Sequence, residues 1–290
     1  MWFYAALLMS LLTGIYVVIS KHTIKNMDPV IFYWVIITAS TPFVFMFAWK
    51  NGIPTLDYMF FIGVFGSAIF YTASKIIFWK TIKNSLLSEI YPLISIGPIF
   101  TLILSIIILS EKVSLYAFLG SGITLLGIYI LNVSSAREGL LKPFKVLYQN
   151  KLAFLMMVSI FIGSVVSIFD KIAINHTFSQ NFLFVVLVED LIIILGLLPW
   201  MLKKKKIVIQ EIITNGKLIL LLAVIFSASN IVGFFALANG NPGLVSSVFR
   251  TQVFFVFLFG YFFLKDRPKL EAIIGTIIMI LGLVVLKLGS

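Results

Sequence analysis

The chain has 290 residues, of which 61% are hydrophobic and 11% are charged, and its mean hydropathy is +1.12. Soluble domains are nearer half apolar and a quarter charged, so we expect lipid to solvate this chain. Cysteine is absent, which excludes disulfides, thiolate metal sites and cysteine nucleophiles. The net charge of +11 does not indicate nucleic-acid binding, because the basic residues lie almost entirely between hydrophobic runs and form no nucleic-acid-binding motif.

Ten hydrophobic runs follow one another along the chain. A helix needs about 20 apolar residues to cross a bilayer, and runs of this length without alternating polarity predict helices rather than barrel strands. The first run begins at Trp2 without a basic segment or a cleavage site, so we interpret it as a retained span. The predicted spans are 2–20, 30–49, 58–79, 86–109, 114–132, 152–170, 181–202, 217–238, 244–264 and 270–287.

The longest connector, residues 133–151, separates five spans from five. Because each half has an odd number of spans, the second half must lie upside down relative to the first. The sequence therefore predicts an all-α membrane protein with ten transmembrane helices in two inverted five-helix repeats. Residues 1–135 form the first repeat, 136–150 the linker and 151–290 the second repeat.

The two halves also share a sequence pattern. Residues 72–132 match residues 227–287 without a gap, at an offset of 155. Duplicated halves are typical of secondary transporters. The matched positions include Asn84 with Asn239, Phe100 with Phe255, Leu109 with Leu264, Glu111-Lys112 with Asp266-Arg267, and Ala117 with Ala272.

Two glycine pairs belong to this pattern. Gly120 and Gly127 match Gly275 and Gly282, and a spacing of seven places each pair on one face of a helix. Small residues on one face let two helix backbones approach closely. We expect the fifth and tenth spans to be scaffold, with a homodimer contact as a further option.

Lys and Arg predict the orientation. The loops after the odd-numbered spans hold 16 of the 22 basic residues, the opposite face holds 4, and Lys75 and Arg250 lie within spans. The positive-inside rule then places loops 1–2, 3–4, 5–6, 7–8 and 9–10 in the cytoplasm and both termini outside. We expect a multi-pass protein of the cell membrane, inner or plasma.

These features resemble the drug/metabolite transporter superfamily in its ten-helix EamA branch. The resemblance covers essentially the whole chain, and it implies a secondary transporter of small polar or amphipathic metabolites. Small four-helix relatives use a glutamate in their first helix for cation exchange, whereas the first span here offers only Ser, Thr and Tyr. The residues that carry the resemblance are Pro98, Leu109-Ser110-Glu111-Lys112, Gly120, Gly127, Leu264-Lys265-Asp266-Arg267, Gly275 and Gly282.

Charged residues inside the predicted spans are the candidate site. A charge in the middle of a bilayer needs a partner or a cavity. A turn near position 82 would place Lys75 and Glu89 at equal depth on adjacent helices, which predicts an ion pair. This pair either contacts substrate or only joins two helices. Asn230 is the counterpart of Lys75 in the second half.

Arg250 lies ~9 Å into the ninth span, and Glu189 and Asp190 lie ~12–14 Å into the seventh from the same face. We expect one acid to meet Arg250 and the other to face a cavity or a neighbouring helix. The Arg fork would suit a carboxylate or phosphate, and the paired acid could take up a proton. Alternatively, Arg250 belongs to a locked structural pair. Tyr71 and Tyr91 are candidate substrate contacts.

Two further polar positions receive a structural interpretation. Asp170-Lys171 answers to Ser20-Lys21 at an offset near 150, and we expect both pairs to snorkel at the interface rather than to guard a cavity. Trp79 lies near the end of a predicted span and is expected to be an interfacial anchor.

The predicted function is secondary active transport of a small metabolite, amino-acid-like or otherwise anionic, by alternating access, with proton coupling as one option. The alternative within transport is efflux of lipophilic cations through Glu189 or Asp190. No ATP-binding motif appears, and the sparse His and absent Cys argue against a membrane-embedded enzyme. We expect no cofactor and no metal; the expected partners are a small-molecule substrate and the lipid bilayer.

Overall fold

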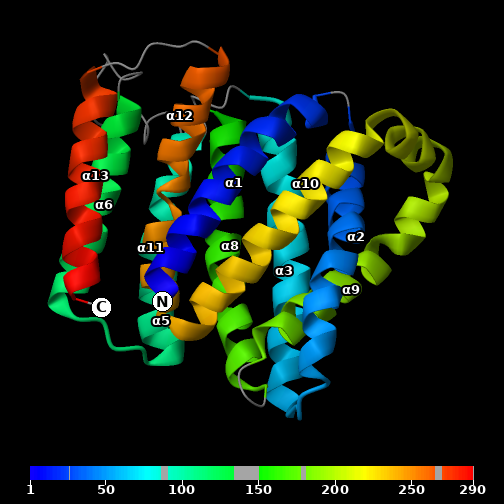
Figure 1. The fold of residues 1–290 in the computed structure, drawn as a ribbon, viewed down its shortest axis with the longest axis horizontal. Helices are drawn as coiled ribbons and strands as arrows, with labels where there is room; N and C mark the ends of the chain where they lie inside the picture. Colours follow the sequence, from blue (N-terminus) through cyan, green and yellow to red (C-terminus); the bar gives the residue numbers. More distant parts are fainter. Residues whose placement is uncertain (26, 86–90, 134–149, 178–180, 265–269, 290) are drawn as a thin grey trace.

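The computed structural model describes residues 1–25, 27–85, 91–133, 150–177, 181–264 and 270–289, and this part of the chain is helical (Figure 1). The first half contains α1 (Trp2–Ile24), α2 (Pro29–Ala48), the 3-10 turn η1 (Trp49–Asn51), α3 (Tyr58–Lys83), the 3-10 helix η2 (Tyr91–Ile96), α5 (Gly97–Leu109) and α6 (Leu115–Val133). The second half contains α8 (Lys151–Asn175), α9 (Phe182–Lys203), α10 (Lys205–Asn239), α11 (Pro242–Phe249), α12 (Gln252–Leu264) and α13 (Leu270–Leu288).

Short polar side chains start several of these helices. Asp28 and Asn241 each accept two backbone N–H bonds in the first turn that follows, and a proline stands at the next position. Asp57, Asn150 and Asn181 cap α3, α8 and α9 in the same way. These caps satisfy N–H groups that have no partner within the helix, so each of these five helices begins at a defined residue.

Within the described residues, six helices are long and apolar enough to cross a membrane: α1, α2, α3, α8, α9 and α10. Gly97–Leu109, Leu115–Ile130 and Ile274–Leu288 are shorter apolar helices. The all-helical membrane fold is therefore confirmed, while the count of ten spans and the inverted repeat stay predictions at this point.

The fourth and ninth hydrophobic runs are each interrupted. In the fourth, η2 gives way to α5 at Gly97, with Pro98 in the first turn. In the ninth, α11 ends at Phe249 and α12 begins at Gln252. Both α5 and α12 have 13 residues, and their first residues are 155 positions apart. The same point of each half therefore carries a break in the helix.

Close helix pairs build the bundle. Helix α6 lies along α13, and glycine makes this possible: a Cβ atom on Gly120 would come within 2.2 Å of the backbone N of Leu286, and one on Gly127 within 2.3 Å of the backbone N of Met279. The scaffold role of these helices is thus visible within one chain. The homodimer contact stays a prediction.

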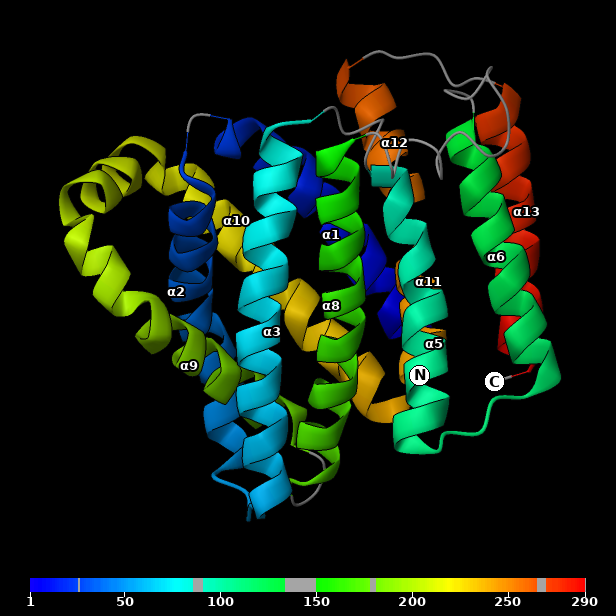
Figure 2. The ribbon, with the colours of Figure 1, turned by 180° about the vertical axis from the view of Figure 1, so that it is seen from behind.

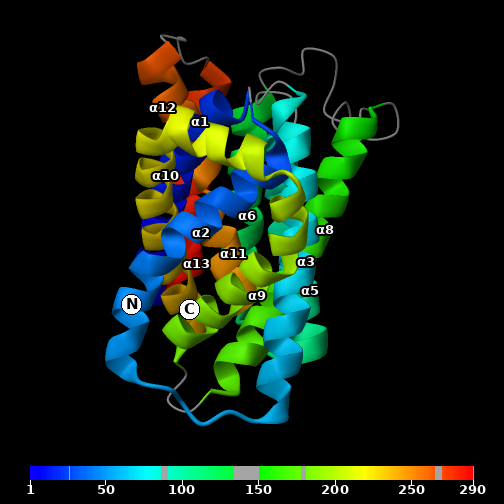
Figure 3. The same cartoon turned by 90° about the vertical axis from the view of Figure 1, so that its right-hand side faces the viewer.

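The other helices form two walls. Helices α1, α10 and α12 pack together on one side, and α3, α5 and α8 pack together on the other, as the side view shows (Figure 3). Helices α2 and α9 contact each other and close one edge between the walls, as the rear view also shows (Figure 2). Both termini lie toward one end of the bundle (Figure 1). The opposite end, hereafter the basic end, carries the last turns of α1, α3 and α9, with Lys21, Lys83 and Lys204.

Candidate functional site

A cavity of about 220 Å³ lies between the two walls, lined by side chains of α1, α3, α8, α9, α10 and α11. Six of the eight predicted site residues line it: Tyr71, Lys75, Glu189, Asp190, Asn230 and Arg250. Glu89 lies outside the described residues, as does the side chain of Tyr91. The predicted Lys75–Glu89 pair is therefore not described.

Lys75 presents its ammonium group between two aromatic rings of its own helix. The Nζ atom lies 5.0 Å from the ring centre of Tyr71 and 5.5 Å from that of Phe78. These residues are four positions before and three positions after Lys75, so all three share one face of α3. The ring faces are electron-rich and stabilise a positive charge at this distance.

Arg250 is placed by the break in the ninth run. It caps α11 and donates its backbone N–H to the carbonyl of Ser246 at 3.1 Å. Its guanidinium group extends across to the opposite wall and lies against Gly97, where a Cβ atom would come within 2.5 Å of Nη2. Gly97 therefore leaves the space that the guanidinium group occupies, at the start of α5.

Three carboxyl groups form the acidic side of the cavity. Asp170 and Glu189 are interacting neighbours in the lining, and Ser67 donates its hydroxyl to Oδ1 of Asp170. Asp190 lies beside Thr41 on α2. All three acids line the same cavity as Arg250. The direct pairing of Arg250 with one of these acids stays a prediction.

Asp170 is the cavity residue that the sequence prediction misplaced. The expected position at the interface is wrong, because Asp170 is 8% exposed and lines the cavity beside Glu189. The snorkelling expected for Lys171 is also wrong, because this side chain is buried at 7% exposure. Helix α8 extends to Asn175, five residues beyond the predicted end, which moves both side chains inside the bundle.

Lys171 and Lys21 bind the carboxyl ends of neighbouring helices. Lys171 donates to the carbonyls of Leu237 at 2.8 Å, Ala238 at 3.1 Å and Gly240 at 3.2 Å, at the end of α10. Lys21 donates to the carbonyls of Ile82 and Ser85, the latter at 2.8 Å, at the end of α3. A cation suits this position because the last carbonyls of a helix have no partner within it.

A serine on each wall makes a second matched contact. On α3, Ser74 donates to the carbonyl of Ser159 on α8 at 2.9 Å. On α10, Ser229 donates to the carbonyl of Met9 on α1 at 3.5 Å. The donors are 155 positions apart and the acceptors 150, so each half builds its wall through the same contact.

Trp79 closes the cavity from the side of α3. Its predicted role as an interfacial anchor is wrong, because α3 continues to Lys83 and the side chain is 2% exposed. Its ring contacts those of Tyr16, Phe32 and Phe78 at centroid distances of 5.7, 5.0 and 5.0 Å. The apolar surroundings therefore outweigh the indole preference for an interface.

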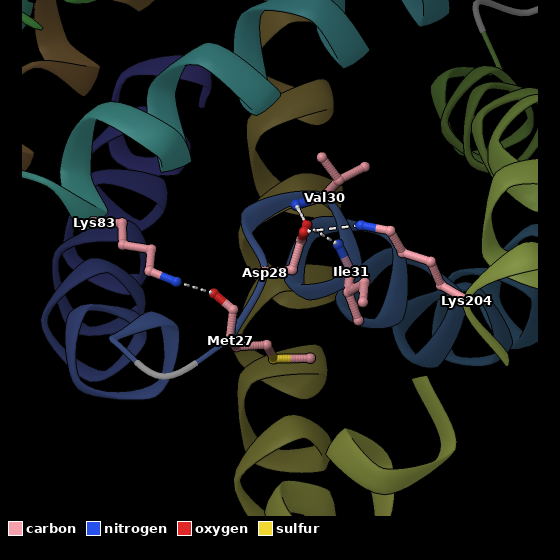
Figure 4. Close-up of polar contacts among 6 residues, drawn as sticks. All are labelled: Met27, Asp28, Val30, Ile31, Lys83 and Lys204. Atoms are coloured by element: carbon pink, nitrogen blue, oxygen red, sulfur yellow. Dashed lines mark hydrogen bonds and ion pairs between the residues drawn. The ribbon is translucent and has the colours of Figure 1, made fainter. Parts of the chain in front are cut away.

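At the basic end, polar contacts tie the helix ends together (Figure 4). The carboxyl of Asp28 caps α2 through Val30 and Ile31, and its Oδ2 lies 3.3 Å from the ammonium of Lys204. Lys83 donates to the carbonyl of Met27 at 2.8 Å. Lys204, at the end of α9, thus joins α9 to α2.

Comparison with known proteins agrees with this architecture. One solved crystal structure is similar to 99% of this chain and 95% of its own, with a TM-score of 0.67 and 12% sequence identity, which supports the fold alone. No curated protein matches the chain. The profile of the EamA-like transporter family matches residues 1–133 and again residues 150–288. The chain therefore belongs to the EamA-like transporter family, whose members are membrane transporters.

Proposed function

We propose that the protein is a secondary active transporter of a small metabolite that carries a carboxylate or another anionic group, with amino-acid-like molecules as the preferred class. The observation that carries this proposal is the charge distribution of the cavity. Lys75 and Arg250 supply positive charge, and Asp170, Glu189 and Asp190 supply negative charge on the same enclosed surface. A molecule with both an ammonium and a carboxylate group finds partners for both.

The matched contacts of the two halves support two inverted five-helix repeats, residues 1–135 and 151–290, that together form ten spans. Lys21 and Lys171 bind helix ends whose carbonyls, at 82 and 237 and at 85 and 240, are 155 positions apart. The two lysines lie toward opposite ends of the bundle. We propose alternating access in which one lysine contact opens while the other holds.

The distribution of basic residues supports an orientation. Lys83 and Lys204 lie at the basic end (Figure 4), where Lys21 also binds the end of α3, and the prediction from loop charges places all three lysines on one side. We propose that this end faces the cytoplasm of a multi-pass cell-membrane protein and that both termini lie outside.

Efflux of lipophilic cations is the second candidate function. It is favoured by the aromatic lining, which includes Tyr16, Tyr71 and Phe226, together with the three acids. Aromatic rings and carboxylates both attract an organic cation. In this case Arg250 would hold the acids in place rather than bind substrate.

A ligand screen separates the two functions. Thermal unfolding of the purified protein would be followed with amino acids, with phosphorylated sugars and with quaternary ammonium dyes. We expect stabilisation by amino acids, abolished in Arg250→Gln and preserved in Lys50→Gln, which removes an exposed charge outside the cavity. Stabilisation only by quaternary ammonium compounds, unchanged in Arg250→Gln, would instead favour cations as the substrates and contradict the amino-acid proposal.

A further inference from the structure

Two carboxyl groups from different helices lie next to each other inside the bundle. Asp170 on α8 and Glu189 on α9 are interacting neighbours in the cavity lining, and they are 8% and 7% exposed. At this separation, two ionised carboxylates repel strongly, because little water is present to screen their charges. A pair in this arrangement binds one proton between its two members, as paired carboxyls do elsewhere.

Two carboxyl oxygens on the acidic side of the cavity also lack a hydrogen-bond donor in the described part of the chain. Oε1 of Glu189 and Oδ2 of Asp190 are buried and accept no hydrogen bond from the described residues. Ionised carboxyl groups are acceptors only, so one acid cannot satisfy another. A proton on the Asp170–Glu189 pair supplies a donor at the place where the structure lacks one.

The charges that face the pair are consistent with one bound proton. Lys75 and Arg250 contribute two positive charges to the cavity, and three ionised acids would contribute three negative charges. One proton on the pair makes the lining neutral, and its loss leaves one negative charge. The titratable groups that face the pair are Asp190 on α9, Lys75 and Tyr71 on α3, Tyr33 on α2, Tyr16 on α1 and Arg250 after α11.

Comparison of the two halves indicates that Asp170 is not needed to pack the helix end that Lys171 binds. Lys171 and Lys21 are 150 positions apart and make equivalent contacts with helix ends. The residue before each lysine differs, since Asp170 in the second half corresponds to Ser20 in the first. The lysine contact is therefore built without an acid in one half, so the packing of the helix end does not account for Asp170.

We propose that the Asp170–Glu189 pair is the proton-binding site of the transporter, loading one proton from one side of the membrane and releasing it to the other during each cycle. The proposal rests on the transport function proposed above and names its coupling ion. Proton binding forms one O–H bond on a carboxylate oxygen, and release returns the electron pair to that oxygen. Ser67 acts as a positioning residue, because its hydroxyl holds Asp170 toward Glu189.

Infrared spectroscopy tests the site without any transport assay. The carbonyl stretch of a protonated carboxyl would be followed through a pH titration of the purified protein in lipid. We expect a band that persists above pH ~4, where ordinary acids are ionised, and that disappears with the loss of one proton. Asp170→Asn and Glu189→Gln should both abolish it, while Asp190→Asn, which alters the neighbouring acid, should retain it.

The amide variants keep a hydrogen bond to the remaining carboxylate, so we expect them to fold, and their thermal midpoints check this. A band retained in both variants would overturn the proposal. A band removed by NaCl at constant pH, but not by KCl, would identify the site as a Na⁺ site instead. Lysine titration does not interfere, because an ammonium group has no carbonyl stretch.

Coupling is tested in proteoliposomes with the amino acid that stabilises the protein best and a pH dye enclosed in the lumen. With one proton per cycle, we expect the wild type to accumulate substrate up to about tenfold under a pH gradient of one unit. Asp170→Asn should still exchange substrate between the two sides but should lose accumulation and the proton flux. Unchanged accumulation in this variant would overturn the coupling role. Absence of any exchange in the wild type would contradict the transport function, whatever the infrared band shows.

Discussion

At the scale of single residues, a glycine determines where the cavity arginine can lie. The guanidinium of Arg250 occupies the space that a side chain on Gly97 would need. The nearest atom to a Cβ there is the flexible end of a side chain rather than backbone, so the arginine can move away at small cost. Gly97 therefore contributes to the site through the space that it leaves.

We predict that Gly97→Ala leaves the fold intact but weakens binding of an anionic ligand about tenfold, which is ~1.4 kcal/mol. The added methyl group would displace Nη2 of Arg250 from its position in the cavity wall. Binding by isothermal calorimetry, with the thermal midpoint as the check of folding, measures this. The matched control is Gly122→Ala, where a Cβ atom meets nothing within 4 Å. Equal affinities in the two variants would contradict the role of Arg250.

A second residue pair lies at the end that carries the termini. The Nδ1 atom of His176 lies 2.6 Å from Oδ2 of Asp57, and the N–H of Phe60 donates to Oδ1 at 3.1 Å. The hydrogen bond from His176 holds the pKa of Asp57 below its usual range, and the Phe60 N–H acts in the same direction. The pair joins the chain before α3 to the chain after α8, where Leu56 and Thr177 form an isolated β-bridge.

The lowered pKa of Asp57 predicts a pH dependence of stability. Because the folded state holds the carboxylate more strongly than the unfolded state, the contribution is complete above the ordinary pKa of 3.8 and is lost as the pH falls through the lower folded pKa. The wild type should therefore exceed Asp57→Asn in thermal midpoint at pH 6, and the difference should shrink toward pH 3. A difference that does not change with pH would contradict this.

At the scale of elements, the sequence reveals some helix boundaries and not others. Pro98 predicts the interruption of the fourth run, because proline lacks the N–H that a continuous helix needs. The interruption at Arg250 and Thr251, between α11 and α12, has no such local signal. Only the match between the two halves, at an offset of 155, indicates it. Helix α10 begins at Lys205, twelve residues before the predicted span, because hydropathy does not report helix that is polar.

The sequence likewise reveals some residues of the candidate site and not others. Charge within an apolar run was enough to select Lys75, Arg250 and Glu189, because a buried charge is costly wherever it lies. Asp170 was missed because a residue near the end of a run has two destinations, the interface or the interior, and only the tilt and length of α8 decide between them. The contact between Asp170 and Glu189 joins two helices and leaves no mark in the spacing of either.

The two lysine contacts predict opposite effects on access to the cavity. Hydrogen bonds to a charged group contribute about 1.5–3 kcal/mol each, so removing those of Lys171 should shift the population at least about tenfold toward a state open at the terminus-bearing end. Lys171→Met should therefore speed labelling from that side at Ser246→Cys, a cavity position in a chain that has no native cysteine. Lys21→Met should speed labelling from the basic end, and equal effects from both sides would contradict separate gates.

At the scale of the whole molecule, one end of the bundle carries the ends of α1, α3 and α9, with Lys21, Lys83 and Lys204, and both termini lie toward the other end (Figure 1). The proposed orientation makes a direct prediction about single-cysteine variants in intact cells. A membrane-impermeant maleimide should label Lys50→Cys, at η1, and should reach Lys206→Cys, at the start of α10, only after permeabilisation. Both positions are exposed, so the pair serves as its own control. The reverse pattern would invert the orientation.

The positions of the two termini constrain the number of times that the chain crosses the membrane. A chain that begins and ends at the same end of a membrane-spanning bundle crosses it an even number of times. The number of crossings stays even however the interrupted runs are assigned. If η2 and α5 each cross half of the membrane, or if α11 and α12 do, the two halves still add up to one crossing. Fusing a reporter to both Met1 and the C-terminus should therefore give the same signal twice, in either orientation. A disagreement between the two reporters would mean that the bundle has lost or gained one crossing.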